Sequence, residues 1–362
     1  MIPALPHIAA MAAYALADLA PPVGKRLVSL SQNECLRAPS PEVAKALHRA
    51  ALAVQLYPDP DWRDLREAIS QVHRIPADQI ICGNGSLDLI GALARAYLEP
   101  GRAALVPAHA YPFFRTATQM TGARLDAAPE ANATVDVDAL LAHLTPETRV
   151  VFVANPGNPT GTRIPRSELM RLRDGMPDDV MLVIDEAYGE FADHLNEAMF
   201  DLVARGDTVV LRTLSKAYGL AGLRVGWGFF PVEIAGQLRK LLNPNNVALA
   251  GQLAATAAMH DQAYMRETCA MTIVLRDAFA DRVRRMGLDV LESFTNFVLI
   301  RFPSAKAAAD ADAALRSEGV FLRPQTGAGL PDCLRATIAQ SEDMGLAANL
   351  LEDWCATKGN IR

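Results

Sequence analysis

Four apolar runs, separated by stretches of helical periodicity, constrain the fold of this chain more than any other feature. Each run is apolar throughout, which is typical of strands buried on both faces of a parallel sheet. The runs are RAALVPA (102–108), RVVFVAN (149–155), DVMLVIDEA (179–187) and DTVVLRT (207–213). Helical patterns occupy residues 60–74 and 165–176. The alternation predicts an α/β fold with a largely parallel sheet, whose functional loops follow the carboxyl ends of the strands.

The pattern of predicted strands and helices changes near residue 265. Beyond it, FTNFVLIRF, GVFLRP and CLRATIA are short strand-like runs between helices, and RPQTGAGLP is predicted to be a loop. The 362 residues are enough for two domains. We therefore expect an N-terminal arm (1–40), a large domain (41–265) and a smaller C-terminal α/β domain (266–362).

Composition narrows the class of protein. The chain is 51% hydrophobic with a net charge of −6, so neither disorder nor a nucleic-acid partner is expected. No apolar run has the length of a membrane span. The N-terminal stretch lacks a basic region and is interrupted by Pro3, Pro6 and Asp18, so a cytoplasmic location is expected. The five cysteines and seven histidines are not at metal-ligand spacing, so no metal is expected.

Two predicted strands are followed by unusual loops. NPGNPTG (155–161) cannot be helical and forms a defined loop, although such a segment taken alone is more often a plain turn than a functional site. Asp185 ends an apolar strand, where a carboxylate needs a cation or a donor. A helix cap or an ion pair is the alternative for Asp185. Tyr188 lies three positions later and could point into the same cleft.

A third loop contains Lys216, just after the strand that ends at Thr213. Thr213 and Ser215 flank the lysine, and Arg224 follows it. Short hydroxyl donors and one guanidinium group are what a phosphate dianion binds. In CGNGSLDLI (82–90), Ser86 is expected to cap a helix whose first N–H groups face an anion. A lysine beside a phosphate site indicates a phosphate-bearing aldehyde cofactor.

Pyridoxal phosphate is the cofactor whose chemistry matches these side chains. Its aldehyde needs an amine, its pyridine nitrogen needs a carboxylate, and its phenolic oxygen needs hydrogen-bond donors. Lys216, Asp185, and Asn158 with Tyr188 would fill these three roles in turn.

Three segments, NPGNPTG, DEAY and TLSKAYGLAGLRVGW, in this order resemble fold-type I pyridoxal-phosphate aminotransferases, and specifically the histidinol-phosphate aminotransferase group. The resemblance extends from Asn33 to the C-terminus. It implies a large domain with a mainly parallel, seven-stranded-type sheet flanked by helices, and a smaller C-terminal α/β domain. It also implies a homodimer with shared active sites.

The resemblance assigns roles to the residues of the cofactor site. Lys216 would hold the cofactor as a Schiff base and move the proton, and Asp185 would pair with the pyridinium. Tyr111 in HAYPFF would stack on the ring, and Tyr57 in LYPDP would reach the cofactor phosphate of the partner subunit. The residues expected to bind the same subunit's phosphate are Ser86, Leu87, Thr213, Ser215 and Arg224.

The resemblance also assigns a substrate side. Arg335 in LRATIA would clamp a carboxylate or a phosphate, with Arg323 in FLRP as its companion. Asn33 would contact the substrate from an N-terminal loop, and Tyr14 is a further candidate. This chain has NECLRAP where the group has Asn-Glu-Asn-Pro, and Leu87 replaces an acidic residue. These departures concern the substrate and not the cofactor.

The function expected from these residues is transfer of an amino group from histidinol phosphate to 2-oxoglutarate, in amino acid biosynthesis. An aromatic amino acid is the alternative donor. A second alternative is decarboxylation of an amino-acid phosphate, because threonine-phosphate decarboxylases resemble this group. A non-catalytic protein of the same fold is disfavoured because Lys216 and its partners are all retained.

Overall fold

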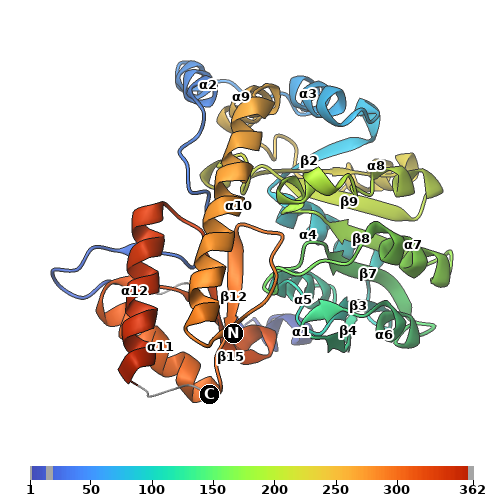
Figure 1. Ribbon diagram of the computed structural model, residues 1–362. Helices are drawn as coiled ribbons and strands as arrows, with labels where there is room; N and C mark the ends of the chain where they lie inside the picture. Colours follow the sequence, from blue (N-terminus) through green and yellow to red (C-terminus); the bar gives the residue numbers. More distant parts are fainter. Residues whose placement is uncertain (1, 14–18, 358–362) are drawn as a thin grey trace.

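The computed structural model describes residues 2–13 and 19–357 and centres on a seven-stranded sheet (Figure 1). In sheet order, the strands are β2 (Ile80–Asn84), β10 (Val225–Phe229), β9 (Thr208–Thr213), β8 (Met181–Asp185), β7 (Thr148–Ala154), β3 (Ala103–Pro107) and β4 (Arg124–Ala128). Strand β10 runs antiparallel to both of its neighbours, and the strands from β9 to β4 are parallel. The predicted mainly parallel sheet is confirmed, and the four apolar runs form β3, β7, β8 and β9.

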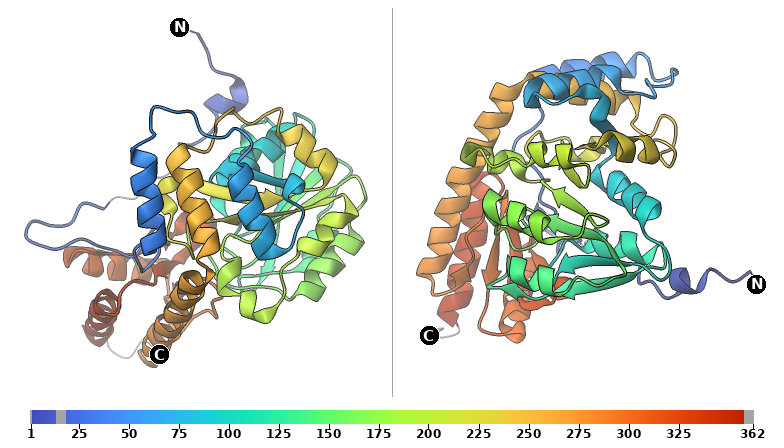
Figure 2. Two further views of the ribbon diagram at one scale, coloured as in Figure 1. Left: turned by 90° about the horizontal axis from the view of Figure 1, so that it is seen from above. Right: turned by 90° about the vertical axis from the view of Figure 1, so that its right-hand side faces the viewer.

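Helices pack around this sheet (Figures 1 and 2). The two helical patterns correspond to α3 (Arg63–His73) and α7 (Arg166–Gly175). The other helices of this part are α2 (Pro41–Ala51), α4 (Ser86–Tyr97), α5 (Pro112–Gln119), α6 (Val137–Ala142), α8 (Val232–Leu238) and α9 (Leu249–His260). Strand residues such as Phe152, Val183 and Leu211 are fully buried in the resulting core. This apolar support fixes the strand ends where the polar residues lie.

A second core lies around a four-stranded antiparallel sheet near the C-terminus. Its strands, in sheet order, are β11 (Asp289–Val290), β12 (Phe297–Arg301), β15 (Leu330–Thr337) and β14 (Arg323–Gln325). Helices α11 (Ala305–Ser317) and α12 (Ser341–Thr357) lie in this part, and the long α10 (Gln262–Arg285) joins it to the rest (Figure 1). No helix among residues 2–13 and 19–357 combines the length and apolarity needed to cross a bilayer.

The prediction that RPQTGAGLP is a loop was wrong at both ends of the segment and held for residues 326–329. Residues Arg323–Gln325 form β14, and a 3-10 turn at Thr326–Ala328 joins β14 to β15. Arg323 pairs with Arg335 and Pro324 with Leu334, before the register shifts at Gln325. The strand-like run GVFLRP had indicated Arg323 and Pro324, but the proline and glycines that follow hid the pairing of Gln325 with β15.

The N-terminal segment joins the second core. Strand β1 (Val28–Ser29) pairs in parallel with β13 (Val320–Phe321), and Leu30 and Leu36 are buried with the C-terminal residues. A short helix, α1 (Pro6–Ala9), precedes it. The boundaries expected at residues 40 and 265 stay a prediction. Residues 28–36, expected to belong to an arm, lie in contact with the small sheet.

Candidate active site

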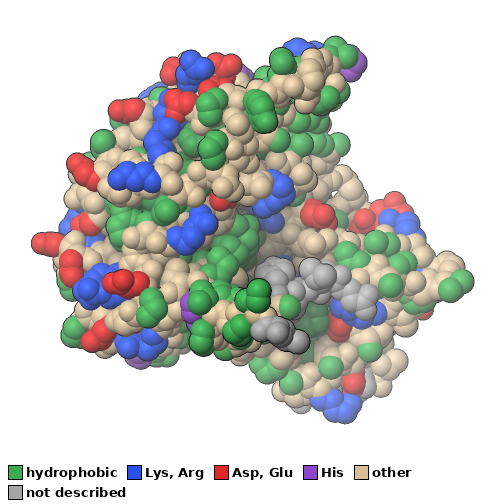
Figure 3. Space-filling view, turned by 180° about the vertical axis from the view of Figure 1, so that it is seen from behind, with side chains coloured by type: hydrophobic (Ala, Val, Ile, Leu, Met, Phe, Trp, Pro, Cys, Tyr) green, Lys and Arg blue, Asp and Glu red, His purple; other side chains and the backbone are tan. Residues whose placement is uncertain are grey.

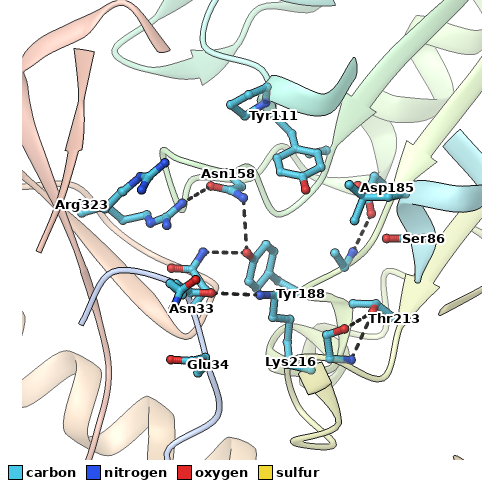
Figure 4. Close-up of a pocket in the computed structure, with 18 of the residues that line it drawn as sticks. Asn33, Glu34, Ser86, Tyr111, Asn158, Asp185, Tyr188, Thr213, Lys216 and Arg323 are labelled. Atoms are coloured by element: carbon cyan, nitrogen blue, oxygen red, sulfur yellow. Dashed lines mark hydrogen bonds between the residues drawn. The ribbon is translucent and has the colours of Figure 1, made fainter. Parts of the chain in front are cut away.

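A pocket of about 500 Å³ lies at the carboxyl ends of β7, β8 and β9 and reaches across to β14 and β15. Its walls come from segments that are far apart in the sequence (Figure 4). Thirteen of the fifteen predicted site residues line it: Asn33, Ser86, Leu87, Tyr111, Asn158, Asp185, Tyr188, Thr213, Ser215, Lys216, Arg224, Arg323 and Arg335. The fold therefore brings the sequence-derived candidates into one cavity.

Lys216 follows the end of β9 and presents its amine to the pocket. Its Nζ donates a hydrogen bond of 3.3 Å to the carbonyl of Gln32. Burial, followed by the positive charges of Arg335 and Arg224, lowers the pKa of Lys216 to about 8. At pH 7 about a tenth of the amine is therefore unprotonated and able to attack an aldehyde, far more than for an ordinary lysine.

Asp185 is the last residue of β8 and is only 3% exposed. Burial raises its pKa to about 7, while the N–H of Ala187, which donates to Oδ1 at 3.1 Å, opposes the shift. Within the described part of the chain Asp185 forms no ion pair, so the ion-pair alternative is not supported there. A buried carboxyl in this state favours a cationic N–H partner within the pocket.

The Tyr188 hydroxyl connects the N-terminal segment with the loop that follows β7. It accepts hydrogen bonds from Asn33 Nδ2 at 2.8 Å and from Asn158 Nδ2 at 3.4 Å. Arg335 Nη1 donates to Asn158 Oδ1 at 2.6 Å, and Arg335 Nη2 donates to the carbonyl of Ser31 at 2.8 Å. The predicted substrate-side and cofactor-side residues thus form one hydrogen-bonded chain, which sequence reasoning had not found.

The start of α4 forms one wall of the pocket. Ser86 was predicted to cap this helix, and that was wrong, because Gly85 is the N-cap and Ser86 is the first helical residue. Gly85 has φ 79°, and a Cβ there would lie 2.5 Å from Arg224 Nη2. A Cβ on Gly226 would lie 2.2 Å from the backbone nitrogen of Ser86. Only glycines allow the helix start and the guanidinium to approach this closely.

Hydroxyl groups complete this wall. Thr213 Oγ1 donates to Ser215 Oγ at 3.0 Å, and Arg224 Nη1 donates to the carbonyl of Ala221 at 2.9 Å. The first N–H groups of a helix have no partner within the helix, so those of Ser86 and Leu87 can meet an anion. Two hydroxyls, a guanidinium group and a helix start fit the phosphate of pyridoxal phosphate. The buried Asp185 and the amine of Lys216 fit its ring nitrogen and its aldehyde.

Two predicted residues are not in the pocket. Tyr57 is 87% exposed and does not line it. Tyr14 lies outside the described residues. Conversely, Ser31, Gln32 and Gln325 line the pocket, although no motif had indicated them. Their only signal was their position next to predicted residues.

Behind the pocket lies a buried charged cluster that the sequence had not indicated. Arg212 of β9 is 1% exposed and donates to Glu186 at 2.9 Å and to Asp193 at 2.9 Å. Glu190 is also within hydrogen-bonding distance, at 3.4 Å. Burial would lower the pKa of Arg212, but the three carboxylates raise it well above its usual value. Three carboxyl groups therefore share one guanidinium group.

Comparison with known proteins agrees with this geometry. The family model for aminotransferase class I and II matches residues 25–350. Histidinol-phosphate aminotransferase of Rhodopseudomonas palustris (strain BisB18) is 41% identical over 337 residues, 92% of each chain. That of Rhodospirillum centenum is 39% identical over 96% of this chain and 97% of its own.

The fold is also that of solved aminotransferases. The crystal structure of histidinol-phosphate aminotransferase from Sinorhizobium meliloti in complex with pyridoxal-5′-phosphate superposes with a TM-score of 0.90 at 29% identity, covering 98% of each chain. Aspartate aminotransferase of Thermus thermophilus shares the fold at 21% identity and a TM-score of 0.83. The predicted fold class, enzyme class and cofactor are confirmed. The chain belongs to the class I and II aminotransferase family and is a pyridoxal-phosphate-dependent transferase of amino groups.

Proposed function

We propose that this enzyme transfers the amino group of histidinol phosphate to 2-oxoglutarate. The observation that carries the proposal is that one cavity holds the amine of Lys216 together with two arginines, Arg323 and Arg335. A phosphate-bearing donor needs such guanidinium groups beside the reacting carbon. The identities of about 40% to histidinol-phosphate aminotransferases support this donor.

We assign the cofactor-side roles to the residues that line the pocket. The phosphate would be held by Ser86, Leu87, Thr213, Ser215 and Arg224. Asp185 would hold a proton on the pyridine nitrogen, Asn158 and Tyr188 would donate to the phenolic oxygen, and Tyr111 would stack on the ring. When bound, pyridoxal phosphate supplies an aldehyde that condenses with amines and a ring that accepts electrons from the substrate carbon.

The protein side chains then position the substrate and move one proton. Arg335 orients the donor through its anionic group, and its bonds to Asn158 and to Ser31 fix the guanidinium plane. Lys216 Nζ takes the proton from the carbon that carries the amino group and returns it on the cofactor side. Its lowered pKa suits this role, because a base works best when its pKa lies near the working pH.

We further propose a homodimer in which Tyr57 of each subunit reaches the cofactor phosphate of the other. Tyr57 is 87% exposed next to Leu52, Val54 and Leu56, which are also exposed. Such an apolar patch suits a subunit interface. Mixing a Lys216→Ala variant with a Tyr57→Phe variant would restore activity in subunits that exchange, because each hybrid dimer has one site with both residues. Absence of restoration would contradict the shared site. The cytoplasmic location stays a prediction.

Absorption of the bound cofactor tests the proposed donor. We expect histidinol phosphate to convert the aldehyde form to the amine form, and 2-oxoglutarate to restore it. Phenylalanine and tyrosine serve as competing donors, and faster conversion by either would favour an aromatic aminotransferase. Release of carbon dioxide without an oxo acid would instead indicate a decarboxylase.

A further inference from the structure

A second cavity, which we call the vestibule, opens from the catalytic pocket. It measures about 720 Å³ and is bounded by α5, by β14 and by residues near the N-terminus, including Ala10 and Leu19. The two cavities share five lining residues: Ser31, Tyr111, Pro112, Arg323 and Gln325. A ligand that extends beyond the catalytic pocket at this wall therefore enters the vestibule.

The charged side chains among the described lining residues of the vestibule are all positive. Among its described lining residues there are three arginines and no aspartate, glutamate or lysine. Arg115 comes from α5, Arg316 from α11 and Arg323 from β14. Seen from behind, the molecule is hollowed between its larger and smaller parts (Figure 3). A concave surface lined by one sign of charge concentrates ligands of the opposite sign.

The arginines of the vestibule differ in their surroundings. Arg316 Nε donates to Asp312 at 2.6 Å, and its guanidinium carbon lies 4.9 Å from the ring centroid of Phe321. Arg115 is exposed and forms no hydrogen bond or ion pair with another described residue. Arg115 belongs to α5 and Tyr111 is the N-cap of that helix, and both residues line the vestibule. The charge of Arg115 is thus available to a ligand.

We propose that the vestibule receives the second carboxylate of the 2-oxo acid acceptor and that Arg115 is the side chain that selects a dicarboxylate. This rests on the aminotransfer function proposed above. When one carboxylate of a five-carbon diacid lies at Arg335, near Lys216, the other end is directed along the shared wall of Tyr111 and Arg323. Arg115 and Arg316 lie beyond this wall, and Arg316 is paired with Asp312.

Specificity then arises as a difference between acceptors. A diacid forms a charge-assisted hydrogen bond with Arg115, whereas a monoacid places only a methyl group in the vestibule. The amino donor carries its anionic group near the reacting carbon, where Arg335 lies. Arg115 therefore distinguishes acceptors and leaves the affinity for the phosphate of the donor unchanged.

Equilibrium binding to the holoenzyme tests this assignment without turnover. Glutarate has two carboxylates and no oxo group, and butyrate has one carboxylate. In calorimetric titration, Arg115→Gln is expected to weaken glutarate binding roughly fivefold to tenfold and to change butyrate binding by less than about twofold. Arg115→Lys should retain part of the glutarate affinity. Arg266→Gln is the matched control, because Arg266 is exposed on α10 and lines neither cavity.

Three results would overturn the assignment. These are an unchanged affinity for glutarate in Arg115→Gln, an equal loss for glutarate and butyrate, or the same loss in Arg266→Gln. Failure of the proposed donor is recognised separately. If histidinol phosphate does not convert the cofactor, the donor assignment fails, but the comparison of glutarate with butyrate still tests the vestibule.

Discussion

Asp185 and Glu186 are adjacent in the sequence and equally buried, yet their surroundings differ in kind. Asp185, at the end of β8, accepts one backbone N–H bond and lines the pocket. Glu186 accepts two bonds from Arg212 and one from the N–H of Met199. The protein itself supplies a cation and hydrogen-bond donors to Glu186, whereas Asp185 remains available to a ligand in the pocket.

The comparison shows how the end of one strand directs two adjacent acids to different places, the ligand site and the core. Because side chains alternate along the chain at the end of β8, one acid faces the cofactor site and the next faces the core. Behind the pocket Glu186 and Glu190 have Arg212 as their cation, so removing the arginine would leave buried carboxylates uncompensated. A buried charge on Asp185, inside the pocket, lowers the stability of the fold unless a ligand supplies a partner. The following experiments separate the two regions.

The largest expected effect is on turnover, from Lys216→Ala. Removing the amine removes the group that binds the aldehyde and moves the proton, so kcat should fall by roughly 10⁴-fold or more. Unfolding by urea should show a stability equal to or above that of the cofactor-free native protein, because a buried amine is lost. Appreciable multiple-turnover transamination by this variant would contradict the role of Lys216.

Arg212→Met should have the largest effect on stability. It leaves Glu186 and Glu190 buried without their cation, which typically costs about 3–5 kcal/mol of unfolding free energy. Denaturant unfolding of the cofactor-free protein measures this loss. Arg239→Met is the control, because Arg239 pairs with Asp61 at the surface and should cost much less. Similar losses in both variants would contradict the stabilising role of the cluster.

Asp185→Asn should change how stability depends on pH. Burial raises the pKa of Asp185 from 3.8 to about 7, so the folded state holds this proton more tightly than the unfolded state. The native cofactor-free protein therefore loses stability as pH rises from about 4 to about 7, by on the order of 2–4 kcal/mol. The variant should lack this loss and be relatively more stable at pH 8. Parallel pH profiles of the two proteins would exclude a buried, ligand-dependent carboxyl.

A smaller effect is expected on cofactor uptake. Since the pKa of Lys216 is lowered to about 8, the fraction of neutral amine rises about tenfold between pH 7 and pH 9 and then levels off. Stopped-flow absorbance of cofactor-free protein mixed with pyridoxal phosphate measures the rate. A rate that keeps rising tenfold per pH unit above pH 9 would show an unshifted lysine.

The sequence predicts the parts of this molecule that follow local rules. Strands β3, β7, β8 and β9 were recognisable because parallel strands buried on both faces are apolar throughout. Asp185 was recognisable because it ends such a strand, and Lys216 because it lies three positions after the end of another. The cap at Gly85 was missed because the close approach of Arg224, which leaves no room for a side chain there, cannot be read from the local sequence.

Long-range pairings account for most of what was missed. Strand β14 depends on β15, and the bond from Arg335 to Asn158 joins residues 177 positions apart. The Arg212 cluster depends on three acids that local patterns do not relate to the arginine. No property of the individual residues encodes these partners.

The contacts between the N-terminal segment and β15 have a consequence for biosynthesis. The N–H of Asn33 donates to Thr337 Oγ1 across 304 positions, and the carbonyl of Leu30 accepts from Thr337 as well. During translation the N-terminal segment leaves the ribosome first, but the strand that holds it is made nearly last. The large sheet can form while Asn33 still lacks its partners. A nascent chain arrested before β15 would thus have Lys216 in place and no finished active site.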